Sequence, residues 1–324
     1  MSAAPAGPPA GLFQFSIQGR RAPALFVTGW IVVVLGVGAS VIALAAGAGT
    51  APTIVLTVGL GLLSVGLFLL GGSQTVEREA AGRAYAGPSP MLVFATIVAV
   101  TFLAAVLVGV PLEVTGVHLD RPVGDLLVGV IEAVVFIGVV RIMVVGTRAI
   151  SWADMGLGLP GRRVAAAILA GASLAIPVIA VTVPVGAILI GIFGVTPPSP
   201  LPPTGTSVGL GLHLVVGAVL APVAEEIVFR GVAVTAWART TGIGTAIVRA
   251  AILFALAHVV VIGGNDFGPA VSVAIVAAVA RLPVALALGW IYVRQGTIWA
   301  SIGLHATFNA ILILLAERAV LAAG

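Results

Sequence analysis

Nine long apolar runs occupy most of the chain and strongly restrict how it can fold. Each run is near or above the ~20 residues that a helix needs to cross the hydrocarbon core of a bilayer. They cover residues 24–47, 51–72, 91–110, 124–146, 164–194, 208–238, 245–262, 269–293 and 297–316. We therefore expect an all-α, polytopic transmembrane bundle of about nine spans, eight or nine depending on how the proline-containing run at 164–194 is counted.

The composition supports this class and excludes others. Hydrophobic residues make up 60% of the chain and charged residues only 8%, whereas a soluble domain carries roughly 25% charged residues. The absence of cysteine excludes disulfides, thiolate zinc sites and a cysteine nucleophile. The arginines form no basic run with interleaved aromatic residues, so we expect no nucleic-acid partner.

The distribution of arginine predicts the orientation in the membrane. Cytoplasmic loops normally carry the excess of basic residues. With the N-terminus inside, only Arg121 and Arg318 fall in outer segments. The inner segments contain Arg20, Arg21, Arg78, Arg83, Arg148, Arg162, Arg163, Arg239 and Arg294. We therefore expect a multi-pass protein of a cell membrane, of the bacterial cytoplasmic type, with its N-terminus inside.

One apolar run concentrates charge. Residues 221–231 are apolar except for Glu225, Glu226 and Arg230. A charged group near the bilayer centre costs at least ~2.5–3.5 kcal/mol on insertion scales, so these groups need partners or a function. Positions four apart share a helix face, which predicts that Glu226 and Arg230 pair while Glu225 projects about 100° away. The cluster is either a packing lock between helices or part of a catalytic site.

Two further pairs with helical spacing follow in later runs. Phe254 lies four residues before His258, and His305 lies four residues before Asn309. A carboxylate that takes a proton from water, imidazoles that polarise this water, and His and Asn donors for an oxyanion suffice for hydrolysis. Alternatively, Glu225 and the two histidines are a set that binds zinc with an open position for water, although there is no His-Glu-x-x-His helix.

Each of these polar groups also has a structural interpretation. Histidine and asparagine side chains commonly hydrogen-bond across membrane helices without taking part in catalysis. Glu132 and Arg281, both well inside apolar runs, are interpreted mainly as a structural ion pair, with contact between Arg281 and the site as the alternative. His118 and His213 are assigned to surface or interface positions.

The ordered set of motifs resembles the CPBP family of intramembrane proteases, which includes the type II CAAX prenyl proteases and bacteriocin-processing and self-immunity proteins. Residues 225–230 are similar to the first motif of this family, residues 254–258 to the second and residues 305–309 to the third. The resemblance extends over roughly residues 152–316. Any one motif is weak, but the ordered set on membrane helices is specific.

The resemblance implies a catalytic role for four residues. Glu225 and His258 would activate the attacking water, while His305 and Asn309 would support the oxyanion. The family is described both as metalloproteases and, for its prenyl-protease branch, as using a metal-free glutamate route. We favour the glutamate route; if Zn²⁺ is present, its ligands are expected to be Glu225, His258 and His305.

The resemblance also divides the chain. Residues 1–22 are expected to be a disordered cytoplasmic lead, residues 23–148 an accessory bundle of four spans, and residues 149–324 the protease core. Within the core, Glu226 and Arg230 would orient the first motif, and Phe254 would form an apolar wall beside the second.

The sequence thus predicts an intramembrane endopeptidase that hydrolyses peptide bonds of membrane-associated peptides or proteins within a lipid bilayer. A non-catalytic membrane scaffold or immunity factor of the same fold is one alternative. A proton-coupled transporter that uses Glu225 as its proton carrier is another. No sequence feature distinguishes a prenyl pocket from a channel for another peptide.

Overall fold

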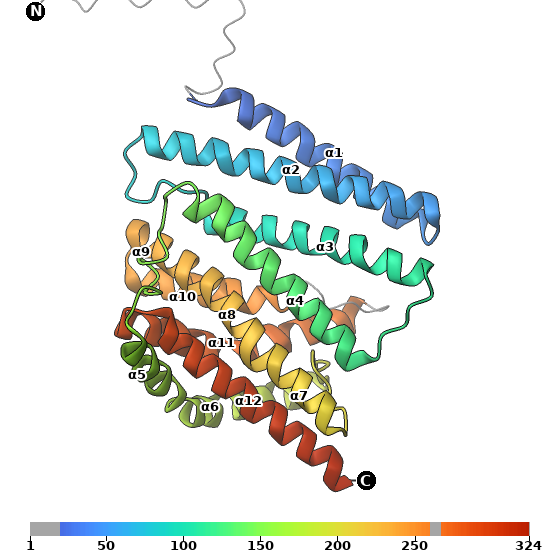
Figure 1. Cartoon of the computed structure of the whole chain (residues 1–324), viewed down its shortest axis with the longest axis vertical. Coiled ribbons are helices and arrows are strands. Elements are labelled where there is room, and N and C mark those ends of the chain that lie inside the picture. Colours follow the sequence, from blue (N-terminus) through green and yellow to red (C-terminus); the bar gives the residue numbers. More distant parts are fainter. Residues whose placement is uncertain (1–19, 260–266, 324) are drawn as a thin grey trace, which may run out of the picture.

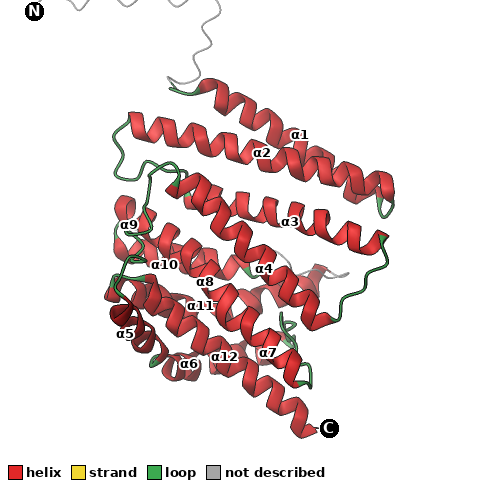
Figure 2. Ribbon diagram, viewed as in Figure 1, coloured by secondary structure: helices red, strands yellow, loops and turns green. Residues whose placement is uncertain are grey.

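The computed structural model describes residues 20–259 and 267–323, and all regular structure within these ranges is helical (Figures 1 and 2). The expected all-α class is therefore confirmed. Residues 1–19 of the predicted lead lie outside the described residues. The first half of the chain forms α1 (Pro23–Ala46), α2 (Thr50–Ala80), α3 (Pro90–Val114), α4 (Arg121–Val140) and the π-helical turn η1 (Arg141–Val145).

The second half contains more and shorter elements. They are α5 (Gly161–Ala172), α6 (Ala175–Phe193), α7 (Ser207–Val215), η2 (Val216–Leu220), α8 (Ala221–Glu226), η3 (Ile227–Val234), α9 (Thr235–Thr241), α10 (Ile243–Ala257), α11 (Phe267–Gln295) and α12 (Ile298–Ala323). The elements from α7 to α9 follow one another without a break, and we call this stretch, Ser207–Thr241, the glutamate span.

Within the described residues, eight helical stretches are long and apolar enough to cross a membrane. The ninth predicted run, 245–262, forms the shorter helix α10, and the residues of this run beyond 259 lie outside the described ranges. The run at 164–194 is a single stretch that is interrupted between α5 and α6. Pro177 has no N–H to donate to the Ser173 carbonyl, which accounts for a break at this point. The expected count of eight to nine is confirmed.

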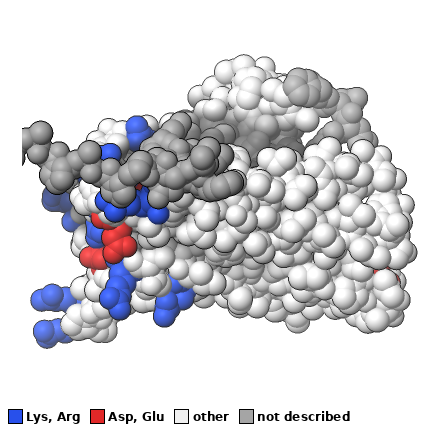
Figure 3. All heavy atoms as spheres, turned by 90° about the horizontal axis from the view of Figure 1, so that it is seen from above, with Lys and Arg blue, Asp and Glu red and all other residues white. Residues whose placement is uncertain are grey.

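Charged side chains gather at one end of the bundle. Figure 3 shows Arg, Asp and Glu side chains concentrated at one side of the visible face, while most of the remaining surface carries none. The loops after α2 and η1 and the turn between α11 and α12 lie at the same end of the bundle, at the left of Figure 1. Such segregation is what the distribution of basic residues across a membrane requires. The inside position of the N-terminus stays a prediction.

The first two helices form a hairpin that packs through glycine. A Cβ added to Gly66 of α2 would lie 2.7 Å from the backbone nitrogen of Val33, and one added to Gly59 would lie 2.8 Å from that of Ser40. Small residues allow backbones in a membrane to approach closely, and this approach replaces the hydrophobic driving force available in water. On the other face of α1, large side chains such as Val34 and Ile42 are exposed, as expected for contact with lipid.

Several of the remaining helices pack directly on the glutamate span. α4 packs along it from α7 to η3, and α10, α11 and α12 also contact it. α5 packs against α12, where Gly171 leaves room for the Ala300 carbonyl. The predicted division at residue 148 stays a prediction, and α4, which it places in the accessory bundle, lies against the predicted core.

Candidate active site

The glutamate span departs from α-helical geometry on both sides of its two glutamates. The π-helical segments η2 and η3 flank the short helix α8. Pro222 lacks an N–H, and the N–H of Ala221 bonds the Val216 carbonyl five residues back. Single π-helical turns inside α-helices occur frequently at functional sites because they re-aim side chains.

Glu226 is completely buried and has two partners. Its Oε1 accepts hydrogen bonds from Arg230 Nη1 at 2.9 Å and from His305 Nδ1 at 2.8 Å. Arg230 is equally buried, and its Nη2 donates to the Ala285 carbonyl of α11 at 3.0 Å. The predicted Glu226–Arg230 pair is confirmed. Together these contacts tie the glutamate span to α11 and α12.

Glu225 has a different environment, although it is the neighbouring residue. Its Oε2 is buried and has no hydrogen-bond partner among the described residues. The nearest basic atom is His305 Nε2, at 3.9 Å. The Glu225 side chain keeps 19% of its surface, whereas that of Glu226 keeps none. One carboxylate is therefore neutralised by its partners, and the other is available to water or substrate.

The partner of His305 determines which of its ring nitrogens is free. The carboxylate of Glu226 can only accept, so Nδ1 of His305 carries the proton in the 2.8 Å contact. Nε2 then points toward Glu225. A carboxylate that orients a histidine in this way is the common arrangement around catalytic imidazoles.

His258 follows the last residue of α10 and is held by its own helix. Its Nδ1 lies 2.8 Å from the Phe254 carbonyl, which can only accept, so Nε2 is again the free nitrogen. The centroid of the His258 ring lies 4.6 Å from that of the Phe254 ring, as the spacing predicts. The centroid of the Phe254 ring also lies 5.7 Å from that of the His305 ring. Phe254 is thus an apolar wall shared by both histidines. Within the described residues, no carboxylate oxygen lies within 4 Å of a ring nitrogen of His258. A direct bond from His258 to Glu225 is therefore absent, and a water molecule would have to join the two side chains.

Asn309 holds α12 against the glutamate span. Its Nδ2 donates to the carbonyl of Gly217, inside the π-helical segment η2, at 2.7 Å. One amide hydrogen is left for another acceptor. His305 and Asn309 therefore face the same span, as their spacing predicts, while their support of an oxyanion stays a prediction.

The prediction of an ion pair between Glu132 and Arg281 is wrong. Among the described residues the two side chains form no ion pair within 4 Å, and Arg281 Nη1 instead donates to the Ala277 carbonyl of its own helix at 2.7 Å. The prediction failed because the pairing depends on how α4 and α11 are shifted and rotated on the glutamate span. Spacing within a single run does not define these registers.

One buried polar pair was missed by the sequence interpretation. His213 of α7, assigned to a surface or interface, is 1% exposed, and its Nε2 lies 3.0 Å from Asp125 Oδ2 of α4. The signal in the sequence was Asp125 itself, a carboxylate at the start of an apolar run.

The residues considered for zinc do not form a metal site as they lie. In the ranges that the structure describes, no three His, Asp or Glu side chains are grouped closely enough to hold a metal ion. His305 uses Nδ1 for Glu226, and His258 is separated from the carboxylates. The chemistry proposed below therefore uses the side chains alone.

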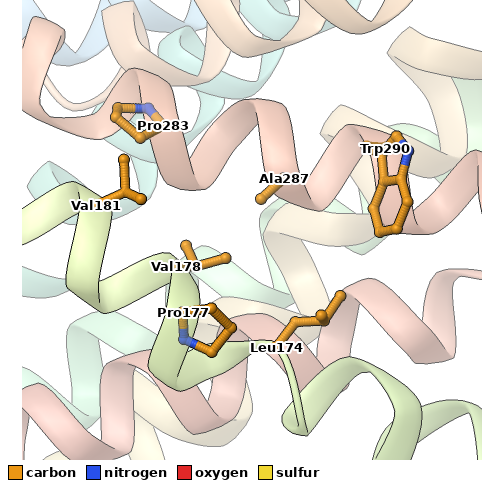
Figure 4. A pocket seen from close by; sticks show the side chains of 7 residues that line it. All are labelled: Leu174, Pro177, Val178, Val181, Pro283, Ala287 and Trp290. Atoms are coloured by element: carbon orange, nitrogen blue, oxygen red, sulfur yellow. The ribbon is translucent and has the colours of Figure 1, made fainter.

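An apolar groove of about 260 Å³ lies elsewhere, between α6 and α11 (Figure 4). Its lining residues are Leu174, Pro177, Val178, Val181, Pro283, Ala287 and Trp290. It contains no titratable side chain, and none of the predicted catalytic residues lines it. This groove is therefore separate from the predicted catalytic residues.

Comparison with known proteins identifies the same part of the chain. Residues 207–311 match the family model described as Type II CAAX prenyl endopeptidase Rce1-like. No curated protein and no solved structure matches the chain. The match begins with α7, ends within α12 and includes every residue assigned to the three motifs. The resemblance seen in the motifs is thus confirmed, since all three lie in a segment that matches the type II CAAX prenyl endopeptidase Rce1-like family of membrane proteases.

Proposed function

We propose that this protein is an intramembrane endopeptidase in which Glu225 is the general base. The observation that carries the proposal is the contrast between the two glutamates. Glu226 is saturated by Arg230 and His305, whereas Glu225 Oε2 is buried and unpartnered among the described residues. A general base must have a free lone pair within reach of the proton it removes, and Glu225 meets this requirement.

The reaction follows from the free atoms of the site. A water held between Glu225 and Nε2 of His258 attacks the scissile carbonyl, and Glu225 takes a proton from it. The new C–O bond forms as the carbonyl π electrons move to oxygen. Collapse of the tetrahedral intermediate breaks the C–N bond, and Glu225 returns the proton to the leaving amine. General acid–base catalysis of this kind contributes roughly 10²–10⁴-fold to the rate.

Two groups on α12 are suited to stabilise the oxyanion. Asn309 retains one amide hydrogen after its bond to Gly217. His305 uses Nδ1 for Glu226, so it can donate to an oxyanion only from Nε2, and only when both ring nitrogens carry protons. Donors aimed at the developing charge are commonly the largest single contribution to catalysis.

The substrate class follows from the surroundings of the site. The glutamate span and α12 are both long and apolar enough to cross a membrane, so the substrate must reach the site within or beside the lipid bilayer. We propose membrane-associated peptides or protein segments as substrates, in a bacterial-type cytoplasmic membrane. Prenylation of the substrate is left to experiment, because no residue contact assigns it.

Cleavage of membrane-anchored reporter peptides tests this proposal. The purified wild type and Glu225→Gln are co-reconstituted with a reporter library, each with and without a strong chelator. The expected result is cleavage by the wild type, with and without chelator, and none by the variant. Cleavage that the chelator abolishes and zinc restores would contradict the metal-free route. An inactive wild type that nevertheless transports protons or binds a partner would contradict proteolysis.

A further inference from the structure

Helix α4 lies outside the segment that matches the protease family, yet a partly buried polar contact joins it to the glutamate span. Asp125 Oδ2 lies 3.0 Å from Nε2 of His213, and Arg121 Nε is 4.0 Å from the same oxygen. A polar pair inside a membrane-spanning bundle is costly to separate, since each partner would be left in an apolar environment. This contact therefore sets the register of α4.

One turn further along α4, the two backbones come close together. A Cβ added to Gly129 would lie 2.9 Å from Cγ1 of Val216, in the π-helical segment η2. Asp125 and Gly129 are four residues apart and share one helix face. This face of α4 therefore lies directly on the part of the glutamate span that precedes the catalytic glutamate.

Glu132 belongs to the same face. It follows Gly129 by three residues and is half-buried, whereas Val130 and Val134 on the other side of α4 are 42% and 66% exposed. α4 packs on α8, the helix that carries Glu225. Glu132 thus lies on the face of α4 that packs on the glutamate span and not on the lipid-exposed face.

Neither of these two carboxyls has a close protein partner: among the described residues, the nearest basic atom to Glu225 is His305 Nε2, at 3.9 Å from its Oε2. In the described part of the chain, Glu132 forms no hydrogen bond or ion pair, and Glu225 Oε2 forms no hydrogen bond. An ionisable group within a membrane span normally faces a partner or a water-filled cavity. Water can satisfy both carboxyls, because a bridging water is nearly as favourable as a direct hydrogen bond.

On the basis of the proposed function, we propose that α4 completes the active site and that Glu132 positions the water that Glu225 activates. Glu132 is then a positioning residue. The two hydrogens of the attacking water are accepted by Glu225 and by Nε2 of His258, so Glu132 accepts a hydrogen bond from a neighbouring water, which donates its other hydrogen to the attacking water; Glu225 removes the proton. The catalytic unit accordingly begins at α4 and not at residue 149.

Kinetics of three variants test this role. Glu132→Gln keeps the shape but loses the negative charge, and we expect kcat to fall roughly 10–100-fold with KM little changed, as for a misplaced reacting group. Glu132→Asp should recover part of kcat. Glu113→Gln, which alters an exposed carboxylate at the end of α3, is the matched control and should have wild-type kcat. Thermal unfolding of each variant separates a loss of kcat from a loss of folded protein.

Thiol labelling tests, without relying on activity, whether position 132 faces water. The native chain has no cysteine, so single-cysteine variants react without background. We expect Glu132→Cys to react with a charged, water-soluble methanethiosulfonate. Val134 is 66% exposed on the opposite side of α4, where the surface faces lipid, so Val134→Cys should react much more slowly. Equal rates at both positions would overturn the inference.

The outcomes separate the inference from the function on which it rests. If the wild type cleaves the reporter and Glu132→Gln does so with the same kcat, the positioning role is overturned while the proposed function stands. If the wild type cleaves no reporter, the proposed function fails, and the labelling rates alone decide whether Glu132 faces water. Loss of kcat in Glu132→Gln, its partial recovery in Glu132→Asp and selective labelling at position 132 together support the inference.

Discussion

The α1–α2 hairpin and the glutamate span are both apolar, but they are held in place by different interactions. The hairpin packs through glycines such as Gly59 and Gly66, and its ion pair, Arg20 with Glu77, lies at its end. The glutamate span carries a fully buried Glu226–Arg230 pair and contains two π-helical segments. The comparison teaches that close packing suffices to assemble membrane helices, whereas a buried polar network indicates a region with a further role.

Substitution of Arg230 is expected to have the largest effect on stability. Arg230→Met keeps much of the side-chain volume but leaves the Glu226 carboxylate buried with only His305 as a partner. Breaking a buried ion pair on one side costs about 3–5 kcal/mol. The thermal midpoint in detergent should fall strongly, and cleavage should be lost. A midpoint equal to that of the wild type would show that the pair is not needed for stability.

Filling the glycine contact of the hairpin should have an intermediate effect, and on stability alone. In Gly66→Val the added atoms meet the backbone of Val33, and overpacking of this kind costs about 1–3 kcal/mol. We expect a lower thermal midpoint with unchanged kcat per folded molecule. A lower kcat in the folded fraction would show that the hairpin is part of the catalytic unit.

The contact between α4 and α7 gives a smaller effect that falls on both properties. Asp125→Asn removes the charge beside the buried His213 but keeps a side chain able to hydrogen-bond. We expect a loss of about 1–2 kcal/mol, because the substitution weakens the hydrogen bond of a buried group and leaving such a group unsatisfied costs about 1–3 kcal/mol. A modest fall in kcat should accompany it, because α4 carries Glu132. The kcat and the thermal midpoint of Asp125→Asn are compared with those of His213→Asn, which should change in the same way. A lower midpoint without any change in kcat would show that the position of α4 does not affect the active site.

The smallest effect is expected at the end of the hairpin. The Arg20 and Glu77 side chains are 24% and 25% exposed, so their ion pair is partly screened by solvent. Arg20→Gln should change the free energy of unfolding by less than about 1 kcal/mol. A loss as large as that of Arg230→Met would remove the contrast between the two regions.

Spacing within a single run predicted the local part of the site. The Glu226–Arg230 pair and the contact between Phe254 and His258 both follow from a separation of four residues on a helix. Hydropathy likewise identified the spans, although α10 ends at Ala257, within the predicted run. These features depend on a short stretch of chain, and a sequence contains the information needed to derive them.

Contacts between helices were not predictable in the same way. The bonds from His305 to Glu226, from Asn309 to Gly217 and from His213 to Asp125 depend on how one helix is rotated and shifted on another. The π-helical turn that exposes the Gly217 carbonyl has no signal in the hydropathy pattern. The wrong pairing of Glu132 with Arg281 has the same cause, since both residues were placed by depth alone.

The most direct test compares the two adjacent glutamates. Reporter cleavage by the wild type, Glu225→Gln and Glu226→Gln is measured in the same vesicles, together with the thermal midpoint of each protein. The account predicts that Glu225→Gln loses at least ~10²-fold in kcat with little change in the midpoint, as for removal of a general base. Glu226→Gln should lower the midpoint because Arg230 loses its ionic partner. Cleavage by Glu225→Gln at the wild-type rate would contradict the account.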